Sequence, residues 1–246
     1  MNGYETALVT GASSGIGEAV VRALAAAGLT VHAIARRADR LAALAEQTGC
    51  QAHAFDATDT EALMRLLDGL AIDILVNNVA TGLGFGDHVS EVDPAVIDQA
   101  VATNLTVSLH ACRLVLPGMI ARGRGHVVTV SSISGLYPIR QALYGATKGG
   151  QHLLHQTLRV ELLGTGVRAT EICPGSTHTE FFDRAFEDDA AGKAAFLESC
   201  RLLDPEDVAD AVLYAVARPA HVNVGTIELT PTGEVPGGIL HDGDER

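Results

Sequence analysis

Hydrophobic positions along the chain fall into two alternating kinds of segment. Short runs rich in β-branched and aliphatic residues predict strands, because such side chains suit a pleated, half-buried surface. Longer stretches rich in Ala and Leu repeat their apolar positions every three to four residues, which is typical of helices. The predicted strands are residues 7–10, 30–35, 52–55, 72–77, 126–130, 168–172 and 226–229. The predicted helices are residues 15–27, 40–47, 60–70, 94–116, 143–163 and 205–217.

The order of these segments predicts the fold class. Several strands, such as residues 72–77, are apolar at consecutive positions, so both of their faces must be covered. Regular alternation of strand and helix gives parallel strands joined by right-handed crossovers. We therefore expect an α/β protein with a doubly wound, seven-stranded parallel sheet and helices on both faces, a Rossmann fold. Gly28 and Pro117-Gly118 are stop signals for the first and fourth helices.

Length and charge narrow the possible partners. The 246 residues, 47% of them hydrophobic, fit a single domain over residues 1–246 with a sizeable core. Lys and Arg number 17 against 30 Asp and Glu, a net charge of -13, which disfavours nucleic acids and anionic membrane surfaces as partners. The first predicted strand begins close to the N-terminus, and no apolar run approaches the roughly 18 to 20 residues of a membrane helix. We expect a soluble, cytoplasmic protein.

The cysteines indicate neither a metal site nor disulfides. Cys50, Cys112, Cys173 and Cys200 form no C-x-x-C pair, and their spacings are wide and irregular. Free thiols in a reducing compartment are the expected state.

Two segments interrupt the alternation and follow predicted strands. Residues 81–90 are rich in Gly, and residues 177–201 carry four Phe among many charges. In open α/β sheets the loops at the carboxyl ends of the strands line the ligand crevice. We expect both segments to form crevice walls, and residues 177–201 to form a lid over the substrate.

A glycine-rich loop lies between the first strand and the first helix. Its sequence is TGASSGIG, residues 10–17. Glycines permit a tight turn and a close approach of the backbone to a ligand, and the helix N-terminus offers free N–H groups to a pyrophosphate. The spacing differs from G-x-G-x-x-G, but the strand before it and the helix after it favour a dinucleotide over a purely structural turn.

The end of the second strand indicates which dinucleotide is bound. A carboxylate at this position would accept hydrogen bonds from the ribose 2′-OH of NAD, but the chain has Arg36 and Arg37 instead. Two guanidinium groups suit a 2′-phosphate, so the sequence predicts NADP(H). The alternative is a solvated pair at a helix start, where positive charge opposes the helix dipole.

Tyr144 and Lys148 stand one helical turn apart and therefore share a face. A nearby ammonium favours the phenolate and lowers the pKa of a tyrosine, which can then exchange a proton with a carbonyl or an alcohol. Ser131 and Ser132 follow the strand at residues 126–130, so either hydroxyl is a candidate partner for the same oxygen.

Taken together and in order, these motifs resemble the short-chain dehydrogenase/reductase family over nearly the whole chain. The resemblance rests on TGASSGIG, Asp56, the run Asn77-Asn78-Val79-Ala80, Asn104, Ser131-Ser132, Tyr144-x-x-x-Lys148 and Pro174-Gly175. It implies a single-domain Rossmann fold, assembly into dimers or tetramers, and hydride transfer between nicotinamide and a carbonyl or secondary alcohol. The C-terminal stretch is similar to the group that contains NADP-dependent 3-hydroxy acid (serine-type) dehydrogenases and clavulanic acid dehydrogenase.

The resemblance also implies residue roles. Tyr144 is the expected general acid or base, Lys148 lowers its pKa and holds the nicotinamide ribose, Ser132 binds the substrate oxygen, and Asn104 anchors a water that relays protons to Lys148. The expected cofactor-binding residues are Gly11, Ser13, Ser14, Gly15, Ile16, Gly17, Arg36, Arg37, Asp56, Ala57, Asn78, Tyr144, Lys148, Pro174, Gly175, Thr177 and Thr179. No metal is expected.

Two departures from the family pattern affect these assignments. Val79-Ala80 stands where the family usually has Ala-Gly, which adds bulk beside the cofactor. The usual spacing to the tyrosine selects Ser131 as the catalytic serine, whereas the register of the strand selects Ser132, and we favour Ser132 because loops absorb deletions more easily than strands do.

The sequence therefore predicts an NADP(H)-dependent oxidoreductase that acts on a ketone, an aldehyde or a 3-oxo or 3-hydroxy acid. Arg140 is a candidate partner for a substrate carboxylate, although an exposed loop arginine is an equal interpretation. The alternatives are a non-catalytic NADPH-binding sensor module and an NAD-dependent alcohol dehydrogenase. A homo-oligomer, either a dimer or a tetramer, is expected.

Overall fold

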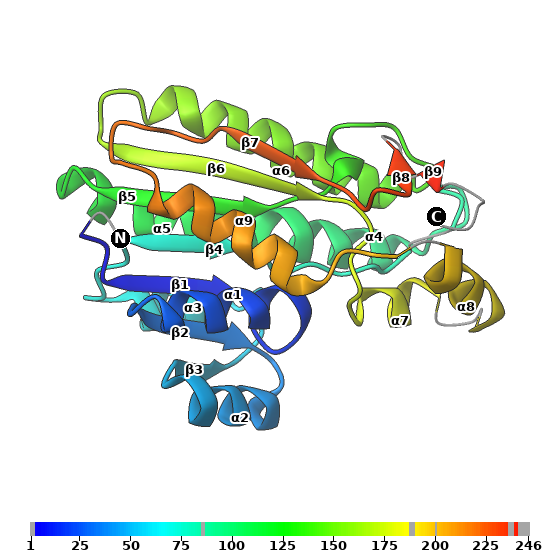
Figure 1. Cartoon of the computed structure of the whole chain (residues 1–246), viewed down its shortest axis with the longest axis horizontal. Helices are drawn as coiled ribbons and strands as arrows, with labels where there is room; N and C mark the ends of the chain where they lie inside the picture. The colour runs from blue at the N-terminus through cyan, green and yellow to red at the C-terminus, as the bar shows by residue number, and fades with distance from the viewer. Residues whose placement is uncertain (1–2, 85–86, 187–189, 200, 236–238, 241–246) are drawn as a thin grey trace.

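The computed structural model describes residues 3–84, 87–186, 190–199, 201–235 and 239–240. Within them, seven parallel strands form one sheet in the order β3-β2-β1-β4-β5-β6-β7 (Figure 1). The strands are β1 (Thr6–Thr10), β2 (Thr30–Ala35), β3 (Gln51–Ala54), β4 (Ile74–Asn77), β5 (Gly125–Val130), β6 (Val167–Pro174) and β7 (Thr226–Leu229). The predicted fold class is confirmed, and strand ends differ from the prediction by a few residues.

Helices cover both faces of the sheet. They are α1 (Gly15–Ala26), α2 (Ala38–Thr48), α3 (Thr60–Leu67), α4 (Pro94–Val101), α5 (Val107–Ala121), α6 (Ala142–Glu161), α7 (Phe181–Ala185), α8 (Ala190–Ser199) and α9 (Pro205–Ala217). Buried side chains of α1, α2 and α9 share one hydrophobic cluster with the sheet, and those of α3, α5 and α6 share a second cluster on the other face.

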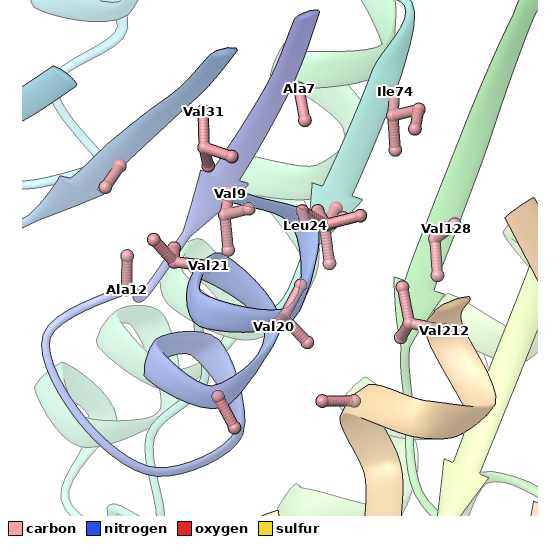
Figure 2. Close-up of a cluster of buried hydrophobic side chains, with 14 of the residues drawn as sticks. Ala7, Val9, Ala12, Val20, Val21, Leu24, Val31, Ile74, Val128 and Val212 are labelled. Carbon is pink, nitrogen blue, oxygen red and sulfur yellow. The ribbon is translucent and has the colours of Figure 1, made fainter. Parts of the chain in front are cut away.

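The alternation of side chains along each strand divides the core between these two clusters. Ala7 and Val9 of β1 belong to the cluster with α1 and α9, whereas Leu8 belongs to the cluster on the opposite face, and all three side chains are fully buried. Figure 2 shows Val20 and Leu24 of α1 beside the strands and Val212 of α9 beside Val128. This two-sided burial is the reason that the strand sequences lack a polar face.

The predicted fourth helix, residues 94–116, is not one continuous α-helix. A five-residue π-helical segment, η1 (Ala102–Thr106), separates α4 from α5. Residue periodicity does not reveal such a segment, because it shifts the hydrogen-bond partner by only one residue. It contains Asn104, a predicted site residue.

Pro117-Gly118 does not end the helix as predicted, because α5 continues to Ala121 with Pro117 inside it. The end comes at Gly123, whose φ of 63° is left-handed. Met119 beyond the proline is fully buried against the sheet, and this packing offsets the backbone hydrogen bond that a proline cannot make.

All seven strands point their carboxyl ends at the same edge of the sheet, where α7 and α8 lie (Figure 1). The chain leaves β3 at one side of β1 and returns through β4 on the other, which opens a crevice between β1 and β4. A short antiparallel pair, β8 (Glu234–Val235) and β9 (Ile239–Leu240), lies at the same edge and was not predicted.

Cys50, Cys112 and Cys173 are buried free thiols, and Cys200 lies outside the described residues. In the part of the chain that the structure describes, no cluster of His, Cys, Asp or Glu is arranged to hold a metal ion. None of the helices described here has the length and apolarity to cross a membrane.

Candidate active site

A cavity of about 1060 Å³ opens at the carboxyl edge of the sheet. It is lined by the glycine-rich loop, the ends of β2 to β6, the start of α6 and the lid formed by α7 and α8. The structure brings the following predicted site residues to this one cavity: Gly11, Ser13, Ser14, Gly15, Ile16, Gly17, Arg36, Arg37, Asp56, Ala57, Asn78, Ser132, Tyr144, Lys148, Pro174, Gly175, Thr177 and Thr179. Asn104 is fully buried behind the wall.

The glycine-rich loop is shaped by close backbone contacts. Gly11 has a φ of 70°, and a Cβ at Gly17 would lie 2.2 Å from the carbonyl oxygen of Gly11 and 2.5 Å from Asn78 Nδ2. The loop therefore requires glycine at both positions. It leads directly into the N-terminus of α1, whose first N–H groups have no partner within the helix.

Asn78 holds this loop against the end of β4. Its Nδ2 donates to the carbonyl oxygens of Thr10 (2.9 Å) and Gly11 (3.3 Å). The Thr10 hydroxyl accepts from the N–H groups of Asn78 and Val79 at 3.0 and 3.1 Å. The turn that carries the Val79-Ala80 departure is thus fastened at its backbone.

Arg37 is held in a defined orientation at the end of β2. Its Nε donates to Ser13 Oγ at 3.0 Å and its Nη2 donates to Ser14 Oγ at 2.6 Å. Arg36 is more exposed, with its Nη1 3.8 Å from a carboxylate oxygen of Asp56. Both guanidinium groups therefore line the cavity, and Arg37 stands directly beside the glycine-rich loop.

Two further charged residues lie here, Glu180 and Arg40, and the sequence does not indicate either of them. Glu180, from the start of the lid, accepts hydrogen bonds from Arg37 Nη1 at 2.6 Å and from Arg40 Nη1 at 2.5 Å. These two bonds lower the pKa of Glu180 to about 2, so its carboxylate is charged. No local signal links residues 37 and 40 with residue 180, because only the fold brings the lid over β2.

Tyr144 and Ser132 meet at the other end of the cavity. The two side chains are hydrogen-bonded, and the Ser132 hydroxyl also accepts from the N–H of Ser134 at 3.1 Å. Ser131 is also in the wall, but its Oγ is buried and makes no hydrogen bond among the described residues. Of the two serines, it is Ser132 that the strand end directs towards Tyr144.

Lys148 is buried beneath Tyr144. Its Nζ lies 5.8 Å from the centre of the tyrosine ring, and it donates to Gln151 Oε1 at 2.9 Å and to the Val130 carbonyl oxygen at 3.2 Å. Burial lowers the pKa of Lys148 to about 8. Burial raises the pKa of Tyr144 above its ordinary value, opposed by the Ser132 hydrogen bond, which is opposite to the lowering expected from Lys148. Tyr144 is therefore a neutral phenol, able to donate a proton.

Asn104 joins three elements with its side-chain amide. Its Oδ1 accepts from the N–H of Thr81 at 2.7 Å, and its Nδ2 donates to the Thr81 carbonyl oxygen and to Thr147 Oγ1. The π-helical turn of η1 presents this amide to the loop after β4 and to α6, which carries Tyr144 and Lys148. The predicted water relay stays a prediction, because the amide is bonded to protein groups.

Glu234 is a further lining residue that the sequence did not indicate. Its two carboxylate oxygens accept from the N–H (2.7 Å) and the hydroxyl (2.9 Å) of Ser176. Ser176 lies in the loop after β6, next to Gly175 and Thr177. The chain after β7 thus returns to brace the loop that the family resemblance assigns to the cofactor.

The lid is an aromatic cover over Tyr144. The Phe181 ring lies 5.3 Å from the Tyr144 ring between centres and touches Gly82, while Phe182, Phe186 and Phe196 pack on one another. These four rings give the cavity an apolar wall. Arg140 lines the same cavity with its side chain exposed.

The chain is similar in sequence to several known proteins. The sequence profile described as short chain dehydrogenase matches residues 5–190. A probable NADP-dependent dehydrogenase of Haemophilus influenzae is 38% identical over 93% of this chain and 94% of its own. The NADP-dependent 3-hydroxy acid dehydrogenase of Salmonella typhi is 36% identical over 94% and 97%.

A solved structure is similar throughout. The closed form of serine dehydrogenase complexed with NADP+ superposes with a TM-score of 0.90 at 33% identity, covering 98% of this chain and 99% of that one. Since the profile matches most of the chain and the relatives match almost all of it, this protein belongs to the short-chain dehydrogenase family.

Proposed function

We propose that the protein is an NADP(H)-dependent oxidoreductase that transfers hydride between nicotinamide and a carbonyl or secondary alcohol. One observation carries the proposal: Tyr144, Ser132 and Lys148 gather at one end of a cavity whose other end holds the glycine-rich loop and two arginines. The family membership supports the oxidoreductase class, and the site supplies the groups that the reaction needs.

The residues present fit an NADP(H) molecule. The N–H groups at the start of α1 and the tight loop suit a pyrophosphate, and Arg36 and Arg37 suit a 2′-phosphate. Lys148 would hold the nicotinamide ribose, and the loop around Gly175 and Thr177 would hold the carboxamide. The relatives named NADP-dependent and the neighbour complexed with NADP+ support this choice. When bound, the nicotinamide gives or takes the hydride.

The protein's part in reduction is to bind the carbonyl oxygen and to protonate it. The hydroxyls of Ser132 and Tyr144 converge, so both can hydrogen-bond the same substrate oxygen. Tyr144, neutral in its buried position, donates its phenolic proton to that oxygen. Lys148, with a pKa of about 8, is mainly charged at pH 7 and stabilises the phenolate that remains. Alcohol oxidation runs through the same groups in reverse.

The substrate that we propose is a small 3-oxo or 3-hydroxy acid, or a ketone or aldehyde of similar size. The relative named 3-hydroxy acid dehydrogenase supports this class. Arg140 lines the cavity and offers a guanidinium to a carboxylate. The phenylalanines of the lid line the cavity, with Phe181 against Tyr144, and would help to exclude water from the reaction.

The proposal is tested by following NADPH oxidation with a panel of ketones, aldehydes and 3-oxo acids. Replacing Tyr144 by Phe should lower kcat by at least about 100-fold, because the proton donor is lost, while NADPH affinity stays within about threefold. Tyr137→Phe is the matched control, since Tyr137 donates to Glu228 outside this cavity and its loss should leave kcat unchanged. A Tyr144→Phe enzyme with wild-type turnover would overturn the mechanism.

The two alternative functions give different results in the same assay. A non-catalytic NADPH-binding module predicts NADPH binding without turnover on any substrate. An NAD-dependent enzyme predicts tighter binding of NADH than of NADPH. The convergence of Ser132, Tyr144 and Lys148 favours catalysis over binding alone, and Arg36 with Arg37 favours NADPH.

We further propose that the enzyme works in the cytoplasm as a homo-oligomer with small molecules as its ligands. The buried free thiols fit a reducing compartment. The net charge of -13 disfavours nucleic acids and anionic membrane surfaces.

A further inference from the structure

Glu180 lines the cavity and bonds two arginines at once. One carboxylate oxygen accepts from Arg37 and the other from Arg40, at 2.6 and 2.5 Å. Arg37 is at the same time bonded to Ser13 and Ser14 of the glycine-rich loop, so its guanidinium is fixed there. Two guanidinium groups aimed at one anion are the arrangement that also binds a phosphate.

A 2′-phosphate needs the same donors. Three N–H groups of Arg37 already point to Ser13, Ser14 and Glu180, so a phosphate that engages Arg37 from the Glu180 side must share or replace the carboxylate. The two anions repel each other at such a short separation. The Arg36 side chain is 57% exposed, and its Nη1 lies 3.8 Å from a carboxylate oxygen of Asp56. Arg36 is therefore available to the phosphate whether or not Glu180 is displaced.

We propose that Glu180 is a specificity-determining residue: its carboxylate competes with the 2′-phosphate of NADP(H) for Arg37 and Arg40, and so weakens NADP(H) binding without affecting NAD(H). The inference rests on the proposed function, since it assigns the 2′-phosphate to this end of the cleft. It also makes Arg40, which the sequence did not single out, part of the phosphate site.

Other contacts hold the start of the lid in place when Glu180 no longer bonds Arg37 and Arg40. A Cβ at Gly15 would lie 2.9 Å from the methyl carbon of Thr179, which shows how closely Thr179 covers the glycine-rich loop. Phe181 packs on Tyr144 and Gly82. Because the neighbours of Glu180 on both sides remain anchored, exchanging the carboxylate for a phosphate changes affinity at the phosphate and leaves the lid in place.

The test compares ligands that differ only in the 2′-phosphate. Dissociation constants of 2′,5′-ADP and 5′-AMP are measured by calorimetry, and those of NADPH and NADH by fluorescence, for the wild type and Glu180→Gln. Asp183→Asn is the matched control, because Asp183 is a carboxylate of the same lid that pairs with Lys193 rather than with the arginines. Thermal unfolding verifies that each variant is folded.

We expect Glu180→Gln to bind 2′,5′-ADP and NADPH about three- to tenfold more tightly than the wild type, the effect of removing exposed ion pairs that compete for the site. Its affinity for 5′-AMP and NADH should change less than about twofold, and Asp183→Asn should behave as the wild type.

Unchanged or weaker binding of 2′,5′-ADP by Glu180→Gln would overturn the competition, and so would an equal gain for 5′-AMP. If the wild type binds 2′,5′-ADP no more tightly than 5′-AMP, the proposed cofactor preference fails and the competition with it. If the wild type shows that preference but Glu180→Gln gains nothing, the competition alone fails.

Discussion

The side chains of Ser131 and Ser132 point in different directions, and this difference determines which hydroxyl can bond Tyr144. Successive residues of an extended chain point to opposite sides. Ser132 is hydrogen-bonded to Tyr144, whereas the Oγ of Ser131 is buried and makes no hydrogen bond among the described residues. The register at the end of β5, rather than the spacing along the sequence, brings Ser132 to Tyr144.

Alanine substitutions separate the two serines. Ser132→Ala should lower kcat for carbonyl reduction by about 100-fold, because it removes one of two donors at the substrate oxygen. Ser131→Ala, which deletes a hydroxyl of the same size one residue away, should change kcat by less than about threefold. Steady-state kinetics with NADPH measure both, and the reverse ranking would assign the role to Ser131.

The partner of Lys148 gives a second prediction at this scale. Lys148 is charged below its pKa of about 8 and loses its charge above it. The kcat for carbonyl reduction should therefore be level at lower pH and decline above about pH 8. Gln151→Glu places a carboxylate oxygen at the position of Gln151 Oε1, which accepts from Lys148 Nζ at 2.9 Å. It favours the ammonium and should move the decline up by about one pH unit.

Gln151→Met is the control, because it removes the hydrogen bond without adding charge and should move the decline to lower pH. The pH dependence of kcat measures all three enzymes. A decline at the same pH in wild type and Gln151→Glu would show that Lys148 is not the group that titrates.

At the level of elements, two helices contain glycines with opposite roles. Gly17, in the first turn of α1, makes the loop-to-helix junction possible, since a Cβ there would lie 2.2 Å from a carbonyl oxygen. Gly149, within α6, has no atom within 4 Å of the place where a Cβ would be. Packing within the chain demands the first glycine but leaves open space at the second.

Alanine at each position should therefore have opposite effects. Gly149→Ala should raise the free energy of unfolding by about 0.5–1 kcal/mol, because it restricts the unfolded chain and improves helix propensity. Gly17→Ala should lower it by about 1–3 kcal/mol and abolish NADPH binding, because the loop and Asn78 must shift. Urea unfolding and NADPH titration measure these effects, and NADPH binding by Gly17→Ala at wild-type strength would contradict the assigned role.

For the whole molecule, an apolar face on α6 supports the proposed homo-oligomer. Leu153 and Val160 are 67% and 73% exposed and lie about two turns apart, so they share one face of the helix. Leu163, just beyond the helix, is 86% exposed. Exposed aliphatic side chains gathered on one face are typical of a surface that is covered in an assembly.

We expect the double substitution Leu153→Glu and Val160→Glu to dissociate the assembly, because it buries charge in the contact. Light scattering coupled to size exclusion should show the molar mass fall to that of one chain. Met64→Glu is the control, since Met64 on α3 is also exposed, at 53%, but lies away from this face. A wild type that is itself a single chain would refute the proposal.

The sequence by itself determined the sheet, the helices that cover it and the motifs at its carboxyl edge, because these depend on local periodicity and on short spacings. Tyr144 and Lys148 share a face through helix geometry alone, and TGASSGIG turns because of its own glycines. Spacing and composition could not reveal the π-helical segment at Asn104, the passage of α5 through Pro117, or the β8–β9 pair. The first two accompany contacts with distant parts of the chain, since Asn104 bonds Thr81 and Thr147 and Met119 beyond Pro117 is buried against the sheet. The β8–β9 pair is a local antiparallel pair.

Only the tertiary structure decided which side chains meet across the crevice. It placed Glu180 on Arg37 and Arg40, and Glu234 on Ser176, across separations of more than fifty residues along the chain. It also set the charge states: burial raises the pKa of Tyr144 and lowers that of Lys148, although their spacing alone predicts a lowered tyrosine pKa. The physical reason is that desolvation depends on everything packed around a group, whereas a motif records only the neighbours within one element.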